Sequence, residues 1–416
     1  MRLTNGAVSL VALGAALVVA TDDGAQQLGQ FALQKLLKDG RDVFGDYVDA
    51  DMPPSTSSYP STNYYANWMA GLPDSIPLSQ LNIPGTHDAA TWNYTQETQE
   101  SLRYATRCDG TVPAAARAYR CQRASVAEAL SAGVRFLDLR FALDPADSRL
   151  VFWHSAALLS DTAGLEDVLF GMYAWLEAHP TEALVLSLQY ERGTKAGATS
   201  DARVQRMLWD ALVDSAAARR YVWQGRGVVP TLGEVRGKIL LFRRFDLDAL
   251  KPANDYEGKI PGLHMSPTKW LDNKDPGFEL VYNETTNATA YIEDYYYPTP
   301  HLTIEGNIEA KWKVVTEHLQ KAAQGDYDSL FVTFTSGTHV DIIPPVYPEV
   351  MALGPGAGSS HTPRSKSKIK TKAKSVDGIN DRLHDFLQGM KGKRLGIVVM
   401  DFFEEPDGLI DLLLDF

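Results

Sequence analysis

Two histidines and one arginine stand out because each lies at or just after a short apolar run: His87, Arg140 and His154. Histidine titrates near neutral pH, so one ring of such a pair can accept a proton while the other donates one. A carboxylate bonded to each ring would fix its tautomer and stabilise the imidazolium form. Arginine offers a two-pronged contact to phosphate oxygens. This set of side chains therefore indicates cleavage of a phosphodiester by a general acid and a general base.

The composition argues against several other classes of protein. The 416 residues carry a net charge of −12, which opposes a nucleic-acid binder because phosphate backbones require a basic face. There is no Gly-x-Ser-x-Gly nucleophile elbow and no glycine-rich nucleotide loop. The two cysteines, Cys108 and Cys121, are too few for a zinc ribbon or a disulfide-built scaffold. We expect an ordinary globular protein that does not bind nucleic acid.

Apolar runs that alternate with helical patterns predict the elements that position these side chains. Strands are expected at 78–83, 135–139, 150–153, 184–188, 238–242, 290–292, 330–334 and 396–400, and helical patterns at 125–132, 165–178, 202–217, 307–323 and 379–390, with a further helical stretch near 25–39. Strands that alternate with helices form right-handed βαβ units and a parallel sheet. Eight such units close into a TIM-like (β/α)8 barrel with insertions, of the α/β class.

The residues that follow the expected strands are mostly polar and reactive. Barrel enzymes build their sites at the carboxyl ends of the strands, so these side chains should converge on one mouth. Each alone could equally form a salt bridge at the barrel rim. They are His87, Asp88, Arg140, His154, Glu191, Arg244, Asp294, Ser336 and Asp401.

Several motifs in this order resemble the X domain of phosphatidylinositol-specific phospholipase C. Residues 78–88 (LSQLNIPGTHD) resemble the opening of that domain, while 132–140 (AGVRFLDLR) and 152–155 (FWHS) resemble its second and third blocks. The ending 396–402 (GIVVMDF) is similar to secreted fungal members. The resemblance covers about residues 64–416 and implies that the barrel is distorted.

The resemblance also implies roles for five catalytic residues. His87 matches the base that takes the proton of the inositol 2-hydroxyl, with Asp401 as its partner. His154 matches the acid that protonates the diacylglycerol leaving group, with Asp88 beside it, and Arg140 matches the phosphate-binding arginine. The substrate would be an inositol phospholipid, and the products a cyclic inositol phosphate and diacylglycerol.

The same comparison implies contacts to the inositol ring. Gln189 stands where bacterial members commonly carry a lysine, which leaves the headgroup preference open. Arg243 and Glu293 remain alternatives to their neighbours Arg244 and Asp294. The residues expected at the ring are Gln189, Glu191, Arg244, Asp294 and Tyr296.

Two rival functions follow from the same barrel. A metal-dependent glycerophosphodiesterase would need a Glu-x-Asp pair where this chain has Asp138-Leu139-Arg140, and an arginine cannot bind a metal ion. Calcium-dependent members carry an acid at the position of Arg140, so we expect neither a metal nor another cofactor. A catalytically silent protein that only binds phosphoinositides or a membrane would be expected to lack one of the matched residues.

The N-terminal residues predict export. Arg2 precedes an apolar run over 7–20 that ends in small residues, which is typical of a secretory signal peptide (1–20), although an uncleaved membrane anchor is the alternative. Residues 21–63 form an N-terminal extension. In an exported chain, Asn93, Asn283 and Asn287 lie in glycosylation sequons, and a Cys108–Cys121 disulfide could form.

One basic stretch interrupts the alternation of strands and helices. Residues 354–376 begin rich in glycine and serine, and then carry a positive charge at every second position: Arg364, Lys366, Lys368, Lys370, Lys372 and Lys374. The stretch is expected to be a flexible surface loop. It either remains solvated or contacts an anionic membrane surface.

Overall fold

The computed structural model describes residue 24 and residues 26–46, 65–106, 114–194, 197–252, 256, 258–356 and 376–415. The predicted signal peptide (1–20), Cys108 and the basic positions from Arg364 to Lys374 lie outside the described residues. Of the predicted extension (21–63), only residues 24 and 26–46 are described.

The strands form one strongly curved sheet. Its hydrogen-bonded order is β7-β6-β5-β2-β1-β11-β10-β9-β8, and neighbours are parallel except for β8 and β9. The two ends of this path, β7 and β8, lie against each other, so the sheet closes almost completely and the predicted distorted barrel is confirmed. The strands are β1 (Ile83–Thr86), β2 (Phe136–Leu143), β3 (Leu150–His154), β4 (Ala157–Leu158), β5 (Ala183–Tyr190), β6 (Lys238–Arg244), β7 (Leu263–His264), β8 (Phe278–Asn283), β9 (Ala288–Glu293), β10 (Leu330–Phe334) and β11 (Ile397–Met400).

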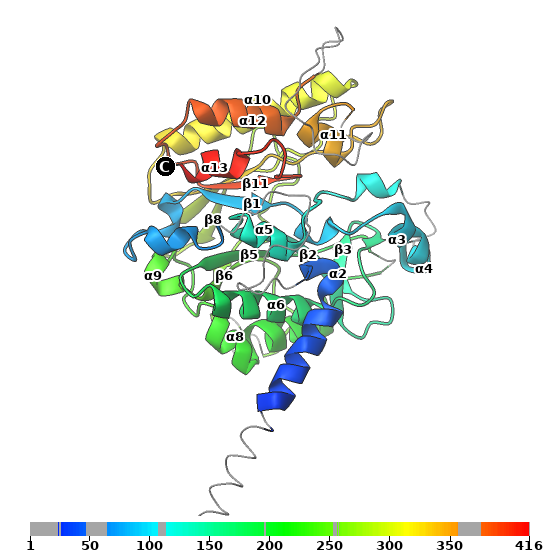
Figure 1. The fold of residues 1–416 in the computed structure, drawn as a ribbon, viewed down its shortest axis with the longest axis vertical. Coiled ribbons are helices and arrows are strands. Elements are labelled where there is room, and N and C mark those ends of the chain that lie inside the picture. The colour runs from blue at the N-terminus through cyan, green and yellow to red at the C-terminus, as the bar shows by residue number, and fades with distance from the viewer. Residues whose placement is uncertain are drawn as a thin grey trace, which may run out of the picture.

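The helices pack outside the strands, with α10 and α12 on one side of the barrel and α6 and α8 on the other (Figure 1). Polar caps fix where several of them begin: Ser125 and Glu128 form a capping box at α5, Asp201 caps α7 and Thr303 caps α10. The helices are α2 (Arg41–Phe44), α3 (Gln96–Ser101), α4 (Arg103–Thr106), α5 (Val126–Ser131), α6 (Leu165–Ala178), α7 (Ala202–Trp209), α8 (Ala216–Tyr221), α9 (Leu232–Val235), α10 (Ile304–Gln324), α11 (Pro348–Leu353), α12 (Ile379–Gln388) and α13 (Leu409–Leu414).

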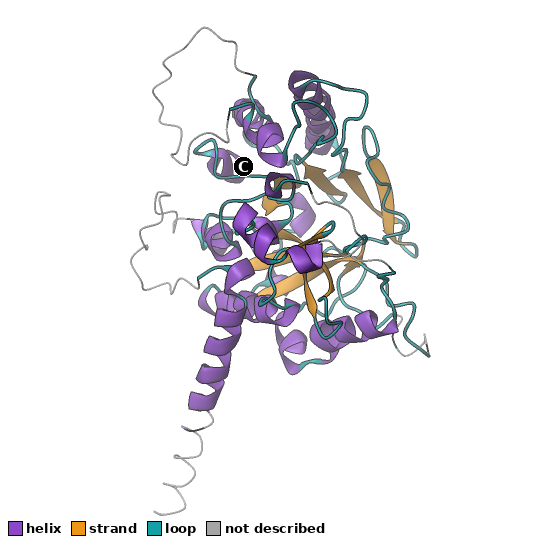
Figure 2. Cartoon of the chain, turned by 90° about the vertical axis from the view of Figure 1, so that its right-hand side faces the viewer, coloured by secondary structure: helices purple, strands orange, loops and turns teal. Residues whose placement is uncertain are grey.

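The helix predicted near residues 25–39 is present over 26–39 and projects away from the barrel (Figure 2). It leads into α2, where Val43 and Phe44 are buried in the core cluster that also contains residues of α6. Phe31, by contrast, is 75% exposed. Within the described ranges, no helix has both the length and the apolar composition needed to cross a bilayer.

Two of the expected barrel strands are wrong in detail. Residues 78–80 form a 3₁₀ turn, and the strand begins only at Ile83. The apolar pattern was misleading because Leu78 and Leu81 pack in the same core cluster as Ile83 without belonging to the strand. The run at 150–153 becomes β3, which pairs antiparallel with β2 instead of joining the barrel. The connection between β2 and β3 is too short for the crossover that a parallel pair requires.

Alternation along the strands separates the two sides of the barrel wall. On β2, Phe136 packs with residues of the facing strands, such as Phe242 at a ring separation of 5.8 Å, while Leu137 and Leu139 belong to the cluster under the helices. Successive side chains of a strand point to opposite faces. Asp138 and Arg140 therefore share the inward face with Phe136, and Arg140 is the one nearer to the carboxyl end of β2, which lies at Leu143.

Candidate active site

A cleft of about 1380 Å³ opens at the carboxyl ends of the barrel strands. It is lined by nine of the ten residues that the sequence predicts for catalysis or substrate binding, and the tenth, Asp88, is buried beside His87 and His154. Ser336 is also buried and does not line the cleft, so its predicted place at the mouth is wrong. The lining residues are His87, Arg140, His154, Gln189, Glu191, Arg244, Asp294, Tyr296 and Asp401.

His87 and Asp401 form a pair because their strands are neighbours in register. Thr86, the last residue of β1, aligns with Met400, the last residue of β11, so the next residue of each strand extends from the same edge. His87 Nδ1 lies 2.8 Å from Asp401 Oδ1. The register thus brings together two residues that are 314 positions apart in the chain.

His154 reaches the same place by a different route. β2 and β3 form a hairpin that extends beyond the barrel, and β3 runs back antiparallel to β2. His154, its last residue, therefore lies close to the His87–Asp401 pair. Its Nε2 lies 3.3 Å from Asp88 Oδ2, and its Nδ1 lies 2.8 Å from the carbonyl oxygen of Tyr119. Because a carbonyl oxygen only accepts hydrogen bonds, Nδ1 carries a proton. Nε2 is then the ring nitrogen that lies toward Asp88.

Tight left-handed turns follow or contain the residues predicted to be catalytic. Asp88, Ser155 and Phe402 have φ angles of 42°, 52° and 47°. Non-glycine residues adopt this region at a cost, and such residues concentrate at functional sites. Here the turns end the strands sharply, so that His87, His154 and Asp401 lie together at the strand ends.

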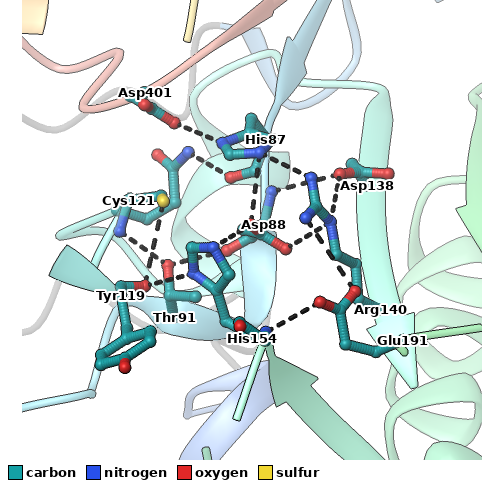
Figure 3. Close-up of polar contacts among 12 residues, drawn as sticks. His87, Asp88, Thr91, Tyr119, Cys121, Asp138, Arg140, His154, Glu191 and Asp401 are labelled. Carbon is teal, nitrogen blue, oxygen red and sulfur yellow. Dashed lines mark hydrogen bonds and ion pairs between the residues drawn. The ribbon is translucent and has the colours of Figure 1, made fainter. Parts of the chain in front are cut away.

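Asp88 lies between the two histidine rings, and Arg140 lies beside Asp88 and His87 (Figure 3). Arg140 Nε is 3.0 Å from Asp88 Oδ1, and Arg140 Nη2 is 2.8 Å from His87 Nε2. His87 Nε2 is also 3.2 Å from Asp88 Oδ2, so it faces both a donor and an acceptor. The nitrogen therefore finds a partner whether it is bare or protonated.

The pKa values of the two histidines shift in opposite directions. Burial alone would lower the pKa of His87, but the carboxylates of Asp88 and Asp401 outweigh it and raise the pKa to about 9. Burial lowers the pKa of His154 below its ordinary value, although Asp88 opposes this. The pKa of Asp88 itself is lowered, since Arg140 and both histidines outweigh its burial.

Three strands present a row of polar side chains beside this centre. Arg140 on β2, Gln189 on β5 and Arg244 on β6 align in register. Below them Asp138 accepts a hydrogen bond of 2.8 Å from Ser187 Oγ and lies 3.6 Å from Arg140 Nε and 3.4 Å from Arg244 Nη1. Asp138 thus holds both guanidinium groups in place.

The structure shows which residue of each adjacent pair, Arg243 or Arg244 and Glu293 or Asp294, reaches the cleft. Arg244 lies over the ring of Trp270 at 3.7 Å and 3.9 Å from Asp294, inside the cleft. Glu293 is fully buried and pairs with Lys311 of α10 at 2.8 Å. Arg244 and Asp294 line the cleft, whereas Arg243 and Glu293 are not among its lining residues, and contact of Arg244 and Asp294 with inositol stays a prediction.

A metal ion would meet a fixed positive charge here. Ligand atoms of His87, Asp88 and Cys121 lie within 4.8 Å of one another, close enough for a cation. The Arg140 guanidinium contacts both His87 and Asp88, however, and would repel it. The metal-free mechanism expected from the sequence stays a prediction.

Known proteins match this chain over most of its length. The sequence model of the family "Phosphatidylinositol-specific phospholipase C, X domain" matches residues 115–245. The 1-phosphatidylinositol phosphodiesterase of Listeria monocytogenes is 31% identical over 342 residues, which cover 81% of this chain and 81% of that protein. The chain belongs to the phosphatidylinositol-specific phospholipase C family.

Other family members agree in sequence and fold. The 1-phosphatidylinositol phosphodiesterase of Staphylococcus aureus is 25% identical over 298 residues, covering 70% of this chain and 80% of that protein. A crystal structure of a variant of the phospholipase C from S. aureus superposes with a TM-score of 0.59 at 19% identity, over 86% of this chain and 98% of that one. The structure of the L. monocytogenes phospholipase C gives 0.55 at 20% identity, over 85% and 98%. The barrel is therefore the fold of these phospholipases.

The sequence reasoning missed four residues of this site: Trp270, Tyr119 and Gln122 in loops, and Asp138 on β2. Trp270 carries Arg244 on its ring and donates 2.9 Å to Asp294 Oδ2. Tyr119 and Gln122 hold backbone and side-chain groups of the catalytic centre. No periodic pattern distinguishes the three loop residues. Only Asp138 carried a signal, the two-residue spacing to Arg140.

The predicted covalent modifications fare differently. Cys121 is a free, buried thiol in the part of the chain that the structure describes, and Cys108 lies outside that part, so the predicted disulfide is not borne out. The backbone amide of Cys121 donates a hydrogen bond of 2.9 Å to Thr91 Oγ1. Asn283 donates 2.7 Å to the Gly227 carbonyl through the nitrogen that a glycan would need. Asn93 and Asn287 are exposed, and their glycosylation stays a prediction.

Proposed function

We propose that this protein cleaves phosphatidylinositol by general acid–base catalysis, giving a cyclic inositol phosphate and diacylglycerol. The single observation that carries the proposal is the placement of Asp88 between two histidines whose ring centroids are 6.3 Å apart, with Arg140 beside Asp88 and His87. One ring is paired with a carboxylate and the other with a backbone carbonyl, so each has a defined orientation. A phosphate held by Arg140 would have a proton acceptor on one side and a proton donor on the other.

The first step is an intramolecular displacement at phosphorus. His87 Nε2 takes the proton of the inositol 2-hydroxyl, and the 2-oxygen forms a bond to phosphorus. The bond from phosphorus to the glycerol oxygen breaks, and His154 Nε2 gives its proton to that oxygen. Asp401 holds the Nδ1 proton of His87 during the transfer, and Arg140 stabilises the charge on the non-bridging oxygens. Opening of the cyclic ester by water would reverse the two roles.

The cleft favours an unphosphorylated inositol ring. Within the described residues, Gln189 Oε1 and Glu191 Oε2 are buried without a hydrogen-bond partner, and both line the cleft. The Gln189 acceptor suits a hydroxyl group, which can donate, and opposes a phosphate group, which at neutral pH mainly accepts. Burial raises the pKa of Glu191 to about 7, so its carboxyl can either accept from a hydroxyl group or donate to one. The outer lining adds the carboxylates of Asp246, Asp248, Asp272 and Asp341. Phosphatidylinositol should therefore be cleaved in preference to its phosphorylated derivatives.

The mouth carries apolar side chains that suit contact with a lipid surface. Leu271, Leu302 and Ile343 are 46%, 72% and 95% exposed and lie in the loops that follow β7, β9 and β10. Hydrogen bonds tie these loops together: Asn273 exchanges two bonds with the Tyr297 backbone, and the Tyr297 hydroxyl donates to Asp341. We propose that this rim contacts the membrane that presents the substrate, with the basic stretch 364–374 as a second contact.

Export of the enzyme completes the proposal. The signal peptide expected at residues 1–20 would direct secretion of the chain, so that it would reach its lipid substrate from outside the cell. Amino-terminal sequencing of protein collected from the culture medium tests this directly. A mature chain that begins after residue 20 supports secretion, whereas a cell-bound chain that retains the apolar run supports an anchor.

A direct assay tests the activity. Purified protein is incubated with vesicles of labelled phosphatidylinositol, and the water-soluble product is identified by ³¹P NMR. We expect the resonance of a five-membered cyclic phosphate, formed by wild type and absent with His87→Ala. Lipid binding without release of any soluble phosphate would instead support the silent, lipid-binding alternative.

A further inference from the structure

A four-residue segment, Tyr119 to Gln122, lies beside both halves of the catalytic centre (Figure 3). We will call it the strap. We propose that the strap is a positioning element that holds the general base and the general acid in one arrangement, and that Gln122 is its principal positioning residue. This inference rests on the proposed function.

The strap holds the acid through its backbone. The Tyr119 carbonyl accepts the Nδ1 proton of His154 at 2.8 Å, which fixes the tautomer and leaves Nε2 toward Asp88. The Tyr119 ring lies edge-on to the His154 ring, with centroids 5.8 Å apart. The orientation of the acid therefore depends on where the strap lies.

The strap holds the base through the Gln122 amide. Its Nε2 donates 2.7 Å to the His87 carbonyl and 2.8 Å to the Met400 carbonyl. Both acceptors are carbonyl oxygens, so the nitrogen of the amide must be the atom that faces them. One side chain thus joins the end of the base strand to the end of the strand that supplies Asp401. Gln122 is 1% exposed, so no water can replace these bonds without entering the core.

Two backbone bonds pin the middle of the strap. The Cys121 amide donates 2.9 Å to Thr91 Oγ1, and the Cys121 carbonyl accepts 3.0 Å from the Phe402 amide. Thr91 Oγ1 in turn donates 2.8 Å to the Asp88 carbonyl. The strap is therefore fixed to the segments that contain Asp88 and Asp401, and a shift at one histidine would reach the other.

The test replaces Gln122 with methionine, which keeps the volume and removes both donors. Misplacement by about 1 Å can cost on the order of 10²-fold in rate, so kcat should fall by roughly that factor while KM changes little. The downfield proton resonance of His87 Nδ1, seen by ¹H NMR in the resting enzyme, should shift or broaden because its bond to Asp401 loses its alignment. This second measurement does not depend on activity.

Asn307→Leu is the matched control. Asn307 is fully buried, and its Nδ2 donates 2.9 Å to the His301 carbonyl and 2.8 Å to the Thr303 carbonyl, none of which lines the cleft. It should lower the melting temperature by a similar amount but leave kcat and the proton resonance unchanged. If Gln122→Met fails to fold, Gln122→Asn, which can reach at most one carbonyl, takes its place and should give a smaller loss.

Each outcome decides the question. A Gln122 variant that loses stability like the control, yet keeps kcat and the His87 resonance, would mean that the amide is only structural and would overturn the inference. A wild-type chain that cleaves no inositol lipid would overturn the proposed function instead. The NMR comparison separates these two failures, because it reads the geometry of the pair without substrate.

Discussion

His87 and His154 share a single carboxylate oxygen: Asp88 Oδ2 lies 3.2 Å from Nε2 of the first ring and 3.3 Å from Nε2 of the second. The two rings therefore titrate as a coupled pair. The raised pKa of His87 and the lowered pKa of His154 place a single proton mainly on His87 between the two transitions. Catalysis needs that proton on His154, so the active form is the minor arrangement of the singly protonated pair.

The pH dependence of kcat/KM should follow this shared proton. We expect a bell-shaped profile whose upper limb lies near the His87 pKa of about 9, because above it the pair holds no proton to give to the leaving group. Asp88→Asn removes a negative charge that stabilises the imidazolium, so the pKa falls and the upper limb moves to lower pH. Asp341→Asn, in the same cleft but bonded to Tyr297, should not move it. An upper limb unmoved in Asp88→Asn would contradict the shared-proton arrangement.

The acid and base roles can be separated with an activated substrate. His87→Ala and His154→Ala should each lose ~10²–10⁴-fold in kcat on phosphatidylinositol. An inositol phosphate with a nitrophenol leaving group needs little protonation, so it should restore His154→Ala far better than His87→Ala. Kinetics on both substrates check this, and equal recovery of the two variants would refute the assignment.

Arg140 should make calcium unnecessary. Activity is expected to persist in excess chelator, because the guanidinium supplies the positive charge that a metal would otherwise bring to the phosphate. Arg140→Lys should still lose roughly 10²-fold in kcat, since a point charge cannot make the two-pronged contact. Activity that a chelator abolishes and calcium restores would revive the metal-dependent rival.

We expect Glu293 to contribute to the stability of the fold and its neighbour Asp294 to substrate binding. Glu293 and Lys311 are both fully buried, so Lys311→Met, which leaves the carboxylate unpaired, should cost about 3–5 kcal/mol of unfolding free energy and leave KM unchanged. Asp294→Asn should raise KM with little change in stability. Thermal unfolding and steady-state kinetics on the two variants give the comparison, and the reverse pattern would mean that the two residues have exchanged roles.

The apolar rim should control binding to vesicles. Burying a side chain such as Ile343 in lipid is worth about 1.5–3 kcal/mol, so Ile343→Ser should bind phosphatidylinositol vesicles roughly ten- to hundred-fold more weakly. Its rate on a soluble inositol phosphate ester should not change. Phe31→Ser is the matched control, because Phe31 is 75% exposed on the helix of residues 26–39, outside these loops.

The basic stretch has a separate test. Six positive charges near an anionic surface would contribute roughly 1 kcal/mol each, so deleting residues 360–376 should weaken binding to anionic vesicles at low salt. Sedimentation with vesicles of increasing anionic content gives the measurement. Unchanged binding would leave the stretch as a solvated loop.

Local patterns in the sequence were sufficient for the outline of the fold and for grouping several candidate site residues at one end of the barrel. The two-residue period of a strand is a local property, so Asp138 and Arg140 had to share one face of β2. The alternation of strands with helices gave the barrel, and the barrel placed the residues after its strands at one mouth. The sequence alone is therefore enough to group His87, Arg140 and Asp401.

Only the tertiary structure decided which neighbour of a pair faces the cleft and which loops enter it. Arg243 and Arg244, or Glu293 and Asp294, point to opposite faces of their strands, and the register between distant strands selects the inner one. His154 needed β3 to turn back against β2, which the apolar run at 150–153 did not reveal. Trp270 and Gln122 lie in loops, where no hydrophobic period shows which way a side chain points. Their positions depend on hydrogen bonds to residues that are distant in sequence.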